Sequence, residues 1–236
     1  MSELNKKQKI RKVSEKIFGT AHTDKILDLY KSSQREANLF PFTPWMLRRK
    51  AIFIHIPKCA GTSVLSTMGH SKYRSHYPFY IYKEANFYKY RRYFKFSFVR
   101  NPWSRMFSVY NYLKNGGNGA EDLKLAVSIK DISFEDFIKN WLTLEKIHSI
   151  RLLHPQHSFI YNPFEKKLEV DFLGKVENFQ SDMRFICEKL GLEYIEHKNN
   201  VSSESNYRDY YNEETIEIVR NLYSFDVELF GYIYER

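Results

Sequence analysis

Residues Ile52–Ser63 read IFIHIPKCAGTS and place a short apolar strand directly before a glycine-containing turn that carries a lysine. A strand, a tight turn and a helix start together aim backbone N–H groups at one point, and such a point binds phosphate or sulfate. The lysine stands before the glycine, whereas the nucleotide-triphosphate loop G-x-x-x-x-G-K-[ST] has it after the glycine. The only Gly-Lys pair, Gly174-Lys175, has Glu169 and Val176 where that loop requires Gly and Ser or Thr. The stretch therefore predicts an anion site that is not an ordinary P-loop.

A second stretch, Phe98–Ser108, also spans the end of a predicted strand and the start of a predicted helix. Arg100 at the strand end offers a planar guanidinium group that suits a phosphate. Pro102 fits the first turn of the following helix. Ser108 lies two turns into that helix, close to the face from which Arg100 starts. Because ligands of open α/β sheets bind beyond the carboxyl ends of the strands, we expect both stretches to face one crevice.

Strands alternate with helices along the rest of the chain. This order predicts an α/β, P-loop-like three-layer fold, with a central parallel sheet flanked by helices. The expected strands are 51–56 and 94–99, together with two extended runs, 158–161 and 168–173, that can pair. The expected helices are 3–18, 23–38, 63–68, 81–92, 103–114, 120–129, 133–142, 179–190 and 213–225.

The chain has 236 residues, of which 43% are hydrophobic, and this is enough for one α/β domain with a helical extension. We place the extension at residues 1–45 and the main domain at 46–236. Two cysteines are too few for a disulfide framework or a cysteine-rich zinc site, so we expect reduced thiols and no metal. No apolar signal region opens the chain and no run of 18 apolar residues occurs, which predicts a cytoplasmic protein.

The formal charge of +9 favours anionic partners. Basic residues are scattered, apart from a run at 6–12 (KKQKIRK) and the short groups 48–50 and 91–92. A solvated helix face is the ordinary explanation of the first run. The alternative is peripheral contact of this helix with the inner face of a membrane, whereas a specific nucleic-acid site is not expected. The sequence carries no signal for the oligomeric state.

Taken together, the two stretches resemble the sulfotransferases that use 3′-phosphoadenosine 5′-phosphosulfate (PAPS) and release 3′-phosphoadenosine 5′-phosphate (PAP). The branch in question contains Golgi carbohydrate sulfotransferases and their soluble bacterial relatives. Its HIPK-x-x-GTS loop reads HIPKCAGTS here, and its V-R-[ND]-P-x-x-R-x-x-S-x-Y element reads VRNPWSRMFSVY. The resemblance extends through Phe172–Phe179 and Tyr207–Tyr211 to Tyr232 and covers about residues 50–234.

The resemblance implies roles for individual residues. The 5′-phosphosulfate would be held by the loop Lys58, Cys59, Ala60, Gly61, Thr62 and Ser63. Arg100 and Ser108 would hold the 3′-phosphate, and the segment that contains Ser202 and Tyr207 would close over the nucleotide. Cys59 stands where the family commonly has threonine, and backbone N–H contacts at this position tolerate the change. A nucleophilic role for Cys59 does not fit, since the resembled chemistry forms no covalent enzyme intermediate.

The implied reaction transfers a sulfuryl group from PAPS to a hydroxyl or amine of a carbohydrate or glycolipid. Lys58 would stabilise the charge on the leaving bridging oxygen, and a histidine would accept the acceptor's proton. His76, eighteen residues before Phe94, fits the position of that base in the family, and His70 is the second choice. His55, within the strand, is expected to be packed and hydrogen-bonded. Candidate acceptor contacts are His70, Arg105, His154 and Gln156.

Two alternatives belong to other classes. A nucleotide kinase on a similar sheet would need a Walker-type loop and magnesium ligands, and the loop is missing. A basic module that binds a membrane or nucleic acid would need clustered cations or stacking aromatic residues on one face.

Overall fold

Three short parallel strands form the centre of the structure, a computed structural model that describes residues 3–18, 23, 40–69, 75–195 and 207–235. The strands lie in the order β1 (Ala51–Phe53), β2 (Phe94–Val99) and β5 (Phe172–Lys175). Ala51 pairs with Phe94, and Phe96 pairs with Phe172. The predicted α/β fold, with a central parallel sheet flanked by helices, is confirmed.

The chain divides into two compact units. Unit 1 comprises residues 1–99 and 156–196 and contains the sheet. Unit 2 comprises residues 100–155 and 197–236, and its described part consists of helices and loops. The expected domain boundary at 45/46 is not one of these divisions and stays a prediction.

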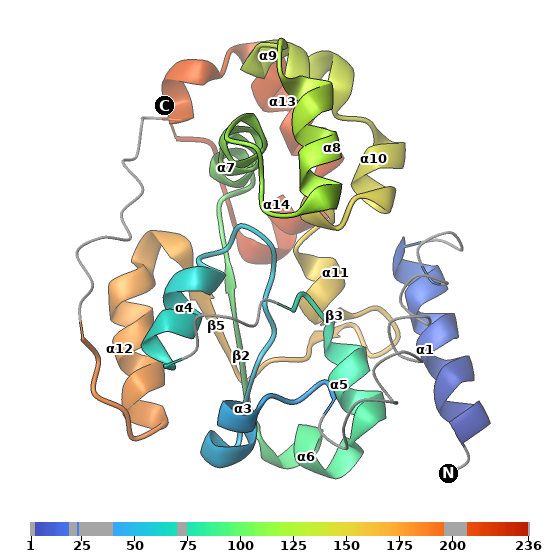
Figure 1. Ribbon diagram of the computed structural model, residues 1–236, viewed down its shortest axis with the longest axis vertical. Coiled ribbons are helices and arrows are strands. Elements are labelled where there is room, and N and C mark those ends of the chain that lie inside the picture. Colours follow the sequence, from blue (N-terminus) through green and yellow to red (C-terminus); the bar gives the residue numbers. More distant parts are fainter. Residues whose placement is uncertain (1–2, 19–22, 24–39, 70–74, 196–206, 236) are drawn as a thin grey trace. The chain divides into compact units, whose positions relative to one another are not determined.

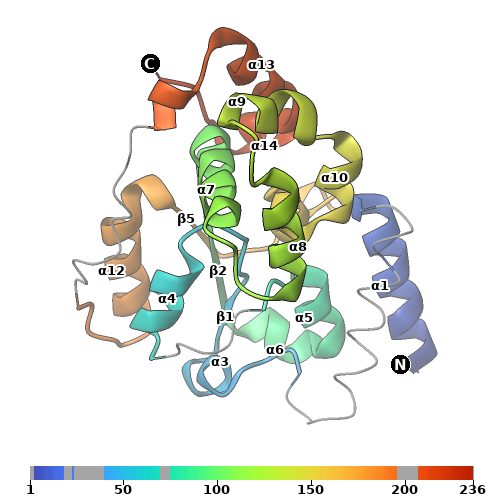
Figure 2. The same ribbon diagram turned by 45° about the horizontal axis from the view of Figure 1, so that its top comes forward.

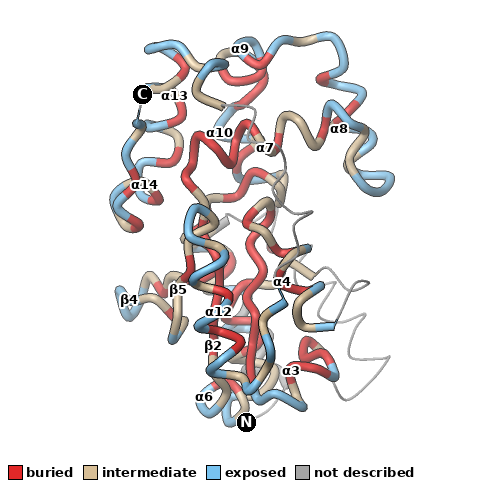
Figure 3. Tube along the Cα trace, turned by 90° about the vertical axis from the view of Figure 1, so that its left-hand side faces the viewer, coloured by how far each residue is buried: buried red, intermediate tan, exposed pale blue. Residues whose placement is uncertain are grey.

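In unit 1, helices lie on both sides of the sheet. Figures 1 and 2 show α4 and α12 on one side and α5 on the other. The burial tube in Figure 3 shows β2 as a buried strand. Besides the strands, unit 1 contains α1 (Glu3–Phe18), α3 (Pro44–Arg49), α4 (Gly61–Thr67), α5 (Phe79–Ala85), α6 (Phe87–Arg92), α11 (His157–Ile160), η3 (Val176–Asn178), α12 (Phe179–Lys189) and the antiparallel pair β3 (Tyr161–Asn162) and β4 (Lys167–Leu168).

Strand β2 has the predicted bounds, but β1 ends earlier than the predicted Ile56. The N–H of Ile54 still donates to the carbonyl of Phe96 at 3.0 Å. The Ile54 carbonyl, however, accepts from the Ser97 hydroxyl at 2.6 Å. Because a side chain takes the place of a backbone donor, the ladder stops there and the chain is released into the loop.

Several predicted elements are divided or different in the structure. The helix 81–92 is interrupted at Asn86, whose side chain caps α6 by accepting from the N–H of Lys89 at 2.9 Å. Residues 157–160 are helical, so the prediction of a strand at 158–161 was wrong. The pairing expected in this region is made by the short strands β3 and β4. The helix 213–225 is divided at Tyr223. The predicted helix 23–38 lies, apart from residue 23, outside the described residues.

Unit 2 is built around α7 (Pro102–Lys114), whose buried side chains include Trp103, Phe107 and Leu113. The indole N–H of Trp103 donates to the Ile216 carbonyl at 2.9 Å, and the Tyr211 hydroxyl donates to the Trp103 carbonyl at 2.9 Å. The other elements are α8 (Ala120–Ile129), α9 (Phe134–Asp136), the π-helix η1 (Phe137–Trp141), α10 (Leu144–Ser149), η2 (Arg151–Leu153), η5 (Tyr207–Tyr210), α13 (Glu213–Leu222) and α14 (Ser224–Phe230).

A buried carboxylate ties the β3–β4 hairpin to the helices of unit 1. Glu169 accepts from Lys83 at 2.8 Å, from Asn162 at 2.7 Å and from the Tyr90 hydroxyl at 3.1 Å. Burial, and then the charge of Glu169, raise the pKa of Tyr90 well above its usual value, so Tyr90 stays a hydrogen-bond donor. The buried charge of Glu169 is thus paired and hydrogen-bonded, as a stable interior requires.

Candidate functional site

The loop after β1 has an unusual backbone. The N–H of Cys59 donates to the Ile56 carbonyl at 3.3 Å, which closes a turn with Pro57 and Lys58 at its centre. Lys58 has φ 63, at a turn position that normally requires glycine or asparagine. Ala60 is also left-handed, with φ 57. Strained non-glycine residues of this kind cluster at functional sites, so the backbone conformation indicates that the loop is a candidate functional site.

Residues of this loop alternate between buried and accessible positions. Pro57, Cys59 and Gly61 are buried, whereas Lys58, Ala60 and Ser63 are half-buried and Thr62 is exposed. Helix α4 begins at Gly61, and no side chain caps its first turn. The first N–H groups of a helix have no partner within the helix. The accessible side thus gathers N–H groups, two hydroxyls and one ammonium group, which together suit a phosphate or a sulfate.

His55 fixes the distance between the strand and α4. Its ring is stacked on Phe53, with centroids 5.3 Å apart, and the residue is buried. A Cβ atom at residue 61 would overlap the His55 imidazole, so only glycine permits this approach of helix to strand. The expected packed position of His55 is confirmed. Its contact with Gly61 was not predicted, because six residues and a turn separate the two.

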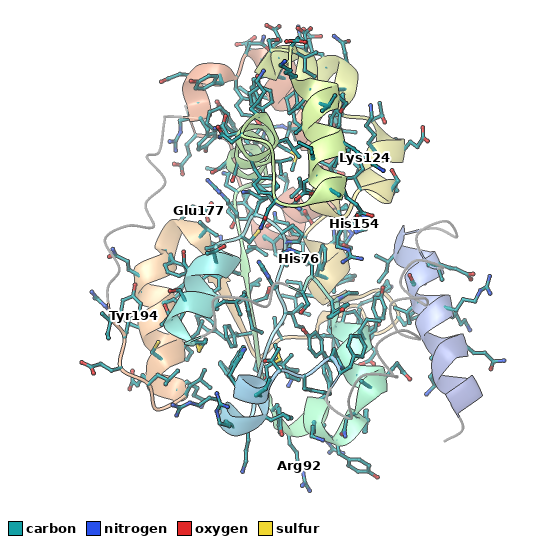
Figure 4. The ribbon with its side chains drawn as sticks, viewed as in Figure 1. His76, Arg92, Lys124, His154, Glu177 and Tyr194 are labelled. Carbon is teal, nitrogen blue, oxygen red and sulfur yellow. The ribbon has the colours of Figure 1, made fainter. Side chains whose placement is uncertain are left out.

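His76 lies against His55 at the end of unit 1 where the strands of the sheet end (Figure 4). The two rings have centroids 4.1 Å apart, and the Nδ1 atom of His76 is 3.1 Å from the His55 carbonyl oxygen. Since a carbonyl only accepts hydrogen bonds, Nδ1 carries the proton and Nε2 is the basic nitrogen of the neutral ring. His76 therefore lies beside the loop, and its role as the base stays a prediction.

A buried hydrogen bond between Cys59 and Gln156 supports the loop. The thiol of Cys59 donates to the Gln156 side-chain oxygen at 3.2 Å, and both side chains are buried. Gln156 was expected to contact the acceptor, but it has no exposed surface to offer. Gln156 supports the loop through this hydrogen bond, and its contact with an acceptor stays a prediction.

In unit 2, the start of α7 explains the V-R-N-P sequence. The Asn101 side chain accepts from the N–H groups of Trp103 at 3.1 Å and Ser104 at 3.4 Å, and Pro102 occupies the first turn. The Arg100 Nε atom donates to the Ser104 hydroxyl at 2.8 Å. Ser108 follows one helical turn after Ser104 and is half-buried. Ser104 was missed from the sequence, although its four-residue spacing from Arg100 could have indicated it.

Two predicted acceptor contacts in unit 2 are buried. Arg105 is 1% exposed, and its guanidinium donates to the Leu152 carbonyl at 3.1 Å. His154, labelled in Figure 4, is also 1% exposed. Their contact with an acceptor stays a prediction. Arg105 holds η2, the short helix that leads into His154.

Tyr207 belongs to an aromatic cluster in unit 2. Its ring lies edge-on to those of Tyr211 and Tyr234, at 6.3 and 6.2 Å, and the Arg208 guanidinium lies 5.0 Å from its centroid. Tyr207 is half-buried and so keeps an accessible part. Ser202 and His70, the other residues proposed from the sequence, lie outside the described residues.

Neither a metal centre nor a membrane span is found in the part of the chain that the structure describes. No group of three or more His, Cys, Asp or Glu side chains there could hold a metal ion. Within the same residues, no helix combines the length and the apolar character needed to cross a bilayer.

Comparisons with known proteins agree with the resemblance. A family model described as the sulfotransferase family matches residues 47–233. A protein of Archaeoglobus fulgidus, named only "Uncharacterized protein", is 29% identical over 118 residues, which are 49% of this chain and 83% of that protein. No solved structure matches the chain.

The contact between His55 and Gly61 predicts a non-additive pair of substitutions. Gly61→Ala should lower the free energy of unfolding by about 1–3 kcal/mol, because its methyl group overlaps a packed ring. In a His55→Ala background the ring is absent, so the same substitution should cost much less. Urea denaturation of the four proteins measures the coupling. Equal costs in both backgrounds would show that the ring does not set the position of α4.

Proposed function

Because the chain belongs to the sulfotransferase family, we propose that it transfers a sulfuryl group from PAPS to a hydroxyl or amine of a carbohydrate or glycolipid. The products are PAP and a sulfated glycan, and the protein is an enzyme that needs no metal. The acceptor class rests on the resemblance to carbohydrate sulfotransferases. The observation that carries the proposal is the strained Lys58 loop, which gathers anion-binding groups at the end of a strand.

Lys58, Thr62 and Ser63 bind the 5′-phosphosulfate of PAPS in this proposal. The support is that all three are accessible, whereas Cys59 and Gly61 between them are buried. The acceptor oxygen attacks the sulfur atom, and the bond between sulfur and the bridging oxygen of PAPS breaks. Lys58 neutralises the charge that develops on that oxygen. Charge stabilisation of this kind contributes most when the cation is already in place, as a turn-bound lysine is.

Arg100 and Ser108 bind the 3′-phosphate of PAPS. The hydrogen bond from Arg100 to Ser104 fixes the guanidinium at the start of α7, on the face that also carries Ser108. Because Asn101 already caps this helix, the phosphate contacts are made by side chains. Tyr207 contributes to the nucleotide site from η5, and we assign the same role to Ser202.

His76 takes the proton from the acceptor. The support is the bond between its Nδ1 and the His55 carbonyl, which leaves Nε2 as the proton acceptor. His70 stays the second choice. Proton transfer by a positioned base contributes typically 10²–10⁴-fold to a rate.

A kinase has no support in the described residues. The Gly174-Lys175 pair lies in strand β5, where Gly174 packs against the Phe98 ring, and not in a phosphate loop.

Thermal unfolding with nucleotides tests the donor. At a concentration 100 times its Kd, PAP should raise Tm by about 5–10 °C, because binding to the folded state alone stabilises it. ATP with magnesium at the same concentration should give a much smaller shift. A shift with ATP–magnesium alone would overturn the assignment of PAPS.

Lys58→Ala should lower kcat for sulfate transfer by about 10²–10³-fold, because it removes the cation at the leaving oxygen. The fold should survive, since the side chain is half-buried. Lys166→Ala is the matched control, as Lys166 is an exposed lysine with φ 50 at another turn of unit 1. Similar losses in both variants would contradict a role for Lys58 in the reaction. Transfer of radiolabelled sulfate from PAPS gives the measurement.

His76→Ala should lower kcat by about 10²–10⁴-fold and leave the affinity for PAP nearly unchanged. The control is His148→Ala, which removes an exposed histidine of unit 2 and should change neither quantity. Calorimetric titration with PAP and steady-state assays separate the two effects. Unchanged turnover in His76→Ala would return the base assignment to His70.

A further inference from the structure

Two short basic groups, far apart in the sequence, meet at one edge of the sheet in unit 1. Residues 48–50 end α3, and residues 91–92 end α6. The N–H of Phe94 donates to the Lys50 carbonyl at 2.9 Å, and Ala51 pairs with Phe94 in the sheet. Figures 1 and 2 both show α3 beside α6. The fold therefore joins two groups that are separate in the sequence into one basic surface.

This edge surface, as we call it, consists of five exposed cations and two exposed aromatic side chains: Arg48, Arg49, Lys50, Arg91, Arg92, Phe87 and Tyr88. Phe87 is 50% exposed and Tyr88 is 77% exposed, although both are large and one is wholly apolar. Residues 44–50 and 86–95 contain no Asp or Glu.

The cations of the edge surface are available for an external partner. No ion pair joins any of the five to a carboxylate of the described residues. Arg49 makes a long hydrogen bond, 3.4 Å, to the Leu190 carbonyl at the end of α12. That end carries one acid and one base, Glu188 and Lys189, so it does not cancel the positive charge. A dense positive field without a carboxylate partner among the described residues indicates an anionic surface as the partner.

We propose that the edge surface docks on a membrane rich in anionic phospholipid. Lysine and arginine near such a membrane are attracted to its headgroups, while exposed phenylalanine and tyrosine enter the interfacial layer. Single-stranded nucleic acid fits less well. It requires ring faces on which bases stack in succession, whereas the rings of Phe87 and Tyr88 lie edge to face, with an interplanar angle of 72°.

Helix α1, the basic helix considered from the sequence, is a weaker candidate for the same contact. Arg11 is paired with Glu15 on the helix surface at 2.8 Å. The ammonium group of Lys16 lies 4.3 Å from the centroid of the Phe164 ring. Part of its charge is thus engaged within the protein, in contrast to the cations of the edge surface.

Docking by the edge surface leaves the Lys58 loop in water. The strands of unit 1 begin at the edge surface, and the loop follows the other end of β1. Figure 4 shows Arg92 and His76 at opposite ends of this unit. Six residues, 51–56, separate the edge surface from the turn, and at roughly 3.3 Å per extended residue they span up to about 20 Å. A soluble nucleotide can therefore reach the loop while the enzyme is docked.

Co-sedimentation of the full chain with vesicles tests the proposal. Wild-type protein should bind vesicles of 70% phosphatidylcholine and 30% phosphatidylglycerol, and bind vesicles of phosphatidylcholine alone at least tenfold more weakly. The variant Arg91→Glu/Arg92→Glu should lose at least ~25-fold in partition coefficient, at about fivefold per cation. Phe87→Ser/Tyr88→Ser should lose severalfold even in 0.5 M salt, where exposed charges are screened.

The charge-matched control is Lys9→Glu/Lys12→Glu on α1, since both lysines are exposed. It should bind vesicles as the wild type does, and the Tm values of all variants should show that they fold. Equal losses in the two charge variants would overturn the assignment to the edge surface, as would wild-type protein that prefers no anionic vesicle. Tighter binding of a 20-nucleotide single strand, lost in Arg91→Glu/Arg92→Glu, would assign the edge surface to nucleic acid.

Discussion

The arrangement of the Lys58 loop and His76 in unit 1 depends on the fit between the His55 ring and Gly61. The ring occupies the volume that a Cβ atom at residue 61 would need, so α4 can begin in this position only with glycine there. The carbonyl of the same histidine binds Nδ1 of His76. One residue, just after the end of β1, therefore positions both the Lys58 turn and the candidate base. A change at His55 is expected to act on both through geometry.

The turn contains residues in backbone conformations that are unfavourable for their residue types. Lys58 and Ala60 are both left-handed, and each costs roughly 1–2 kcal/mol relative to an ordinary conformation. Such conformations persist only where the surroundings determine them fully. Here Pro57 fixes the first turn position, and the thiol of Cys59 is bound to the buried Gln156. The two buried residues that flank Lys58 thus keep its backbone in place while its side chain stays accessible.

The sequence predicted what depends on local chemistry. The alternating aromatic run 94–99 is a strand with the predicted bounds, and Pro102 lies in the first turn of a helix as expected. Predictions from the sequence were wrong where a residue distant in the sequence determines the local structure. Strand β1 ends early because Ser97, on the neighbouring strand, takes the Ile54 carbonyl. Arg105 and Gln156 were candidate acceptor contacts from the resemblance, and the sequence did not show that both are buried, because burial is a property of the whole fold.

The positions of the charged residues, like burial, depend on the fold and not on the local sequence. A formal charge of +9, spread along the sequence, indicated anionic partners without choosing one. Parallel strands give the sheet of unit 1 two unlike edges. At the carboxyl edge, Lys58 is held in a strained turn, as suits a small and precisely placed anion. At the amino edge, five exposed cations stand together without acidic partners among the described residues, as suits a broad anionic surface. Strand direction thereby places the Lys58 loop and the proposed membrane-docking surface at opposite ends of the strands. Substitutions in one of them can therefore leave the other unchanged.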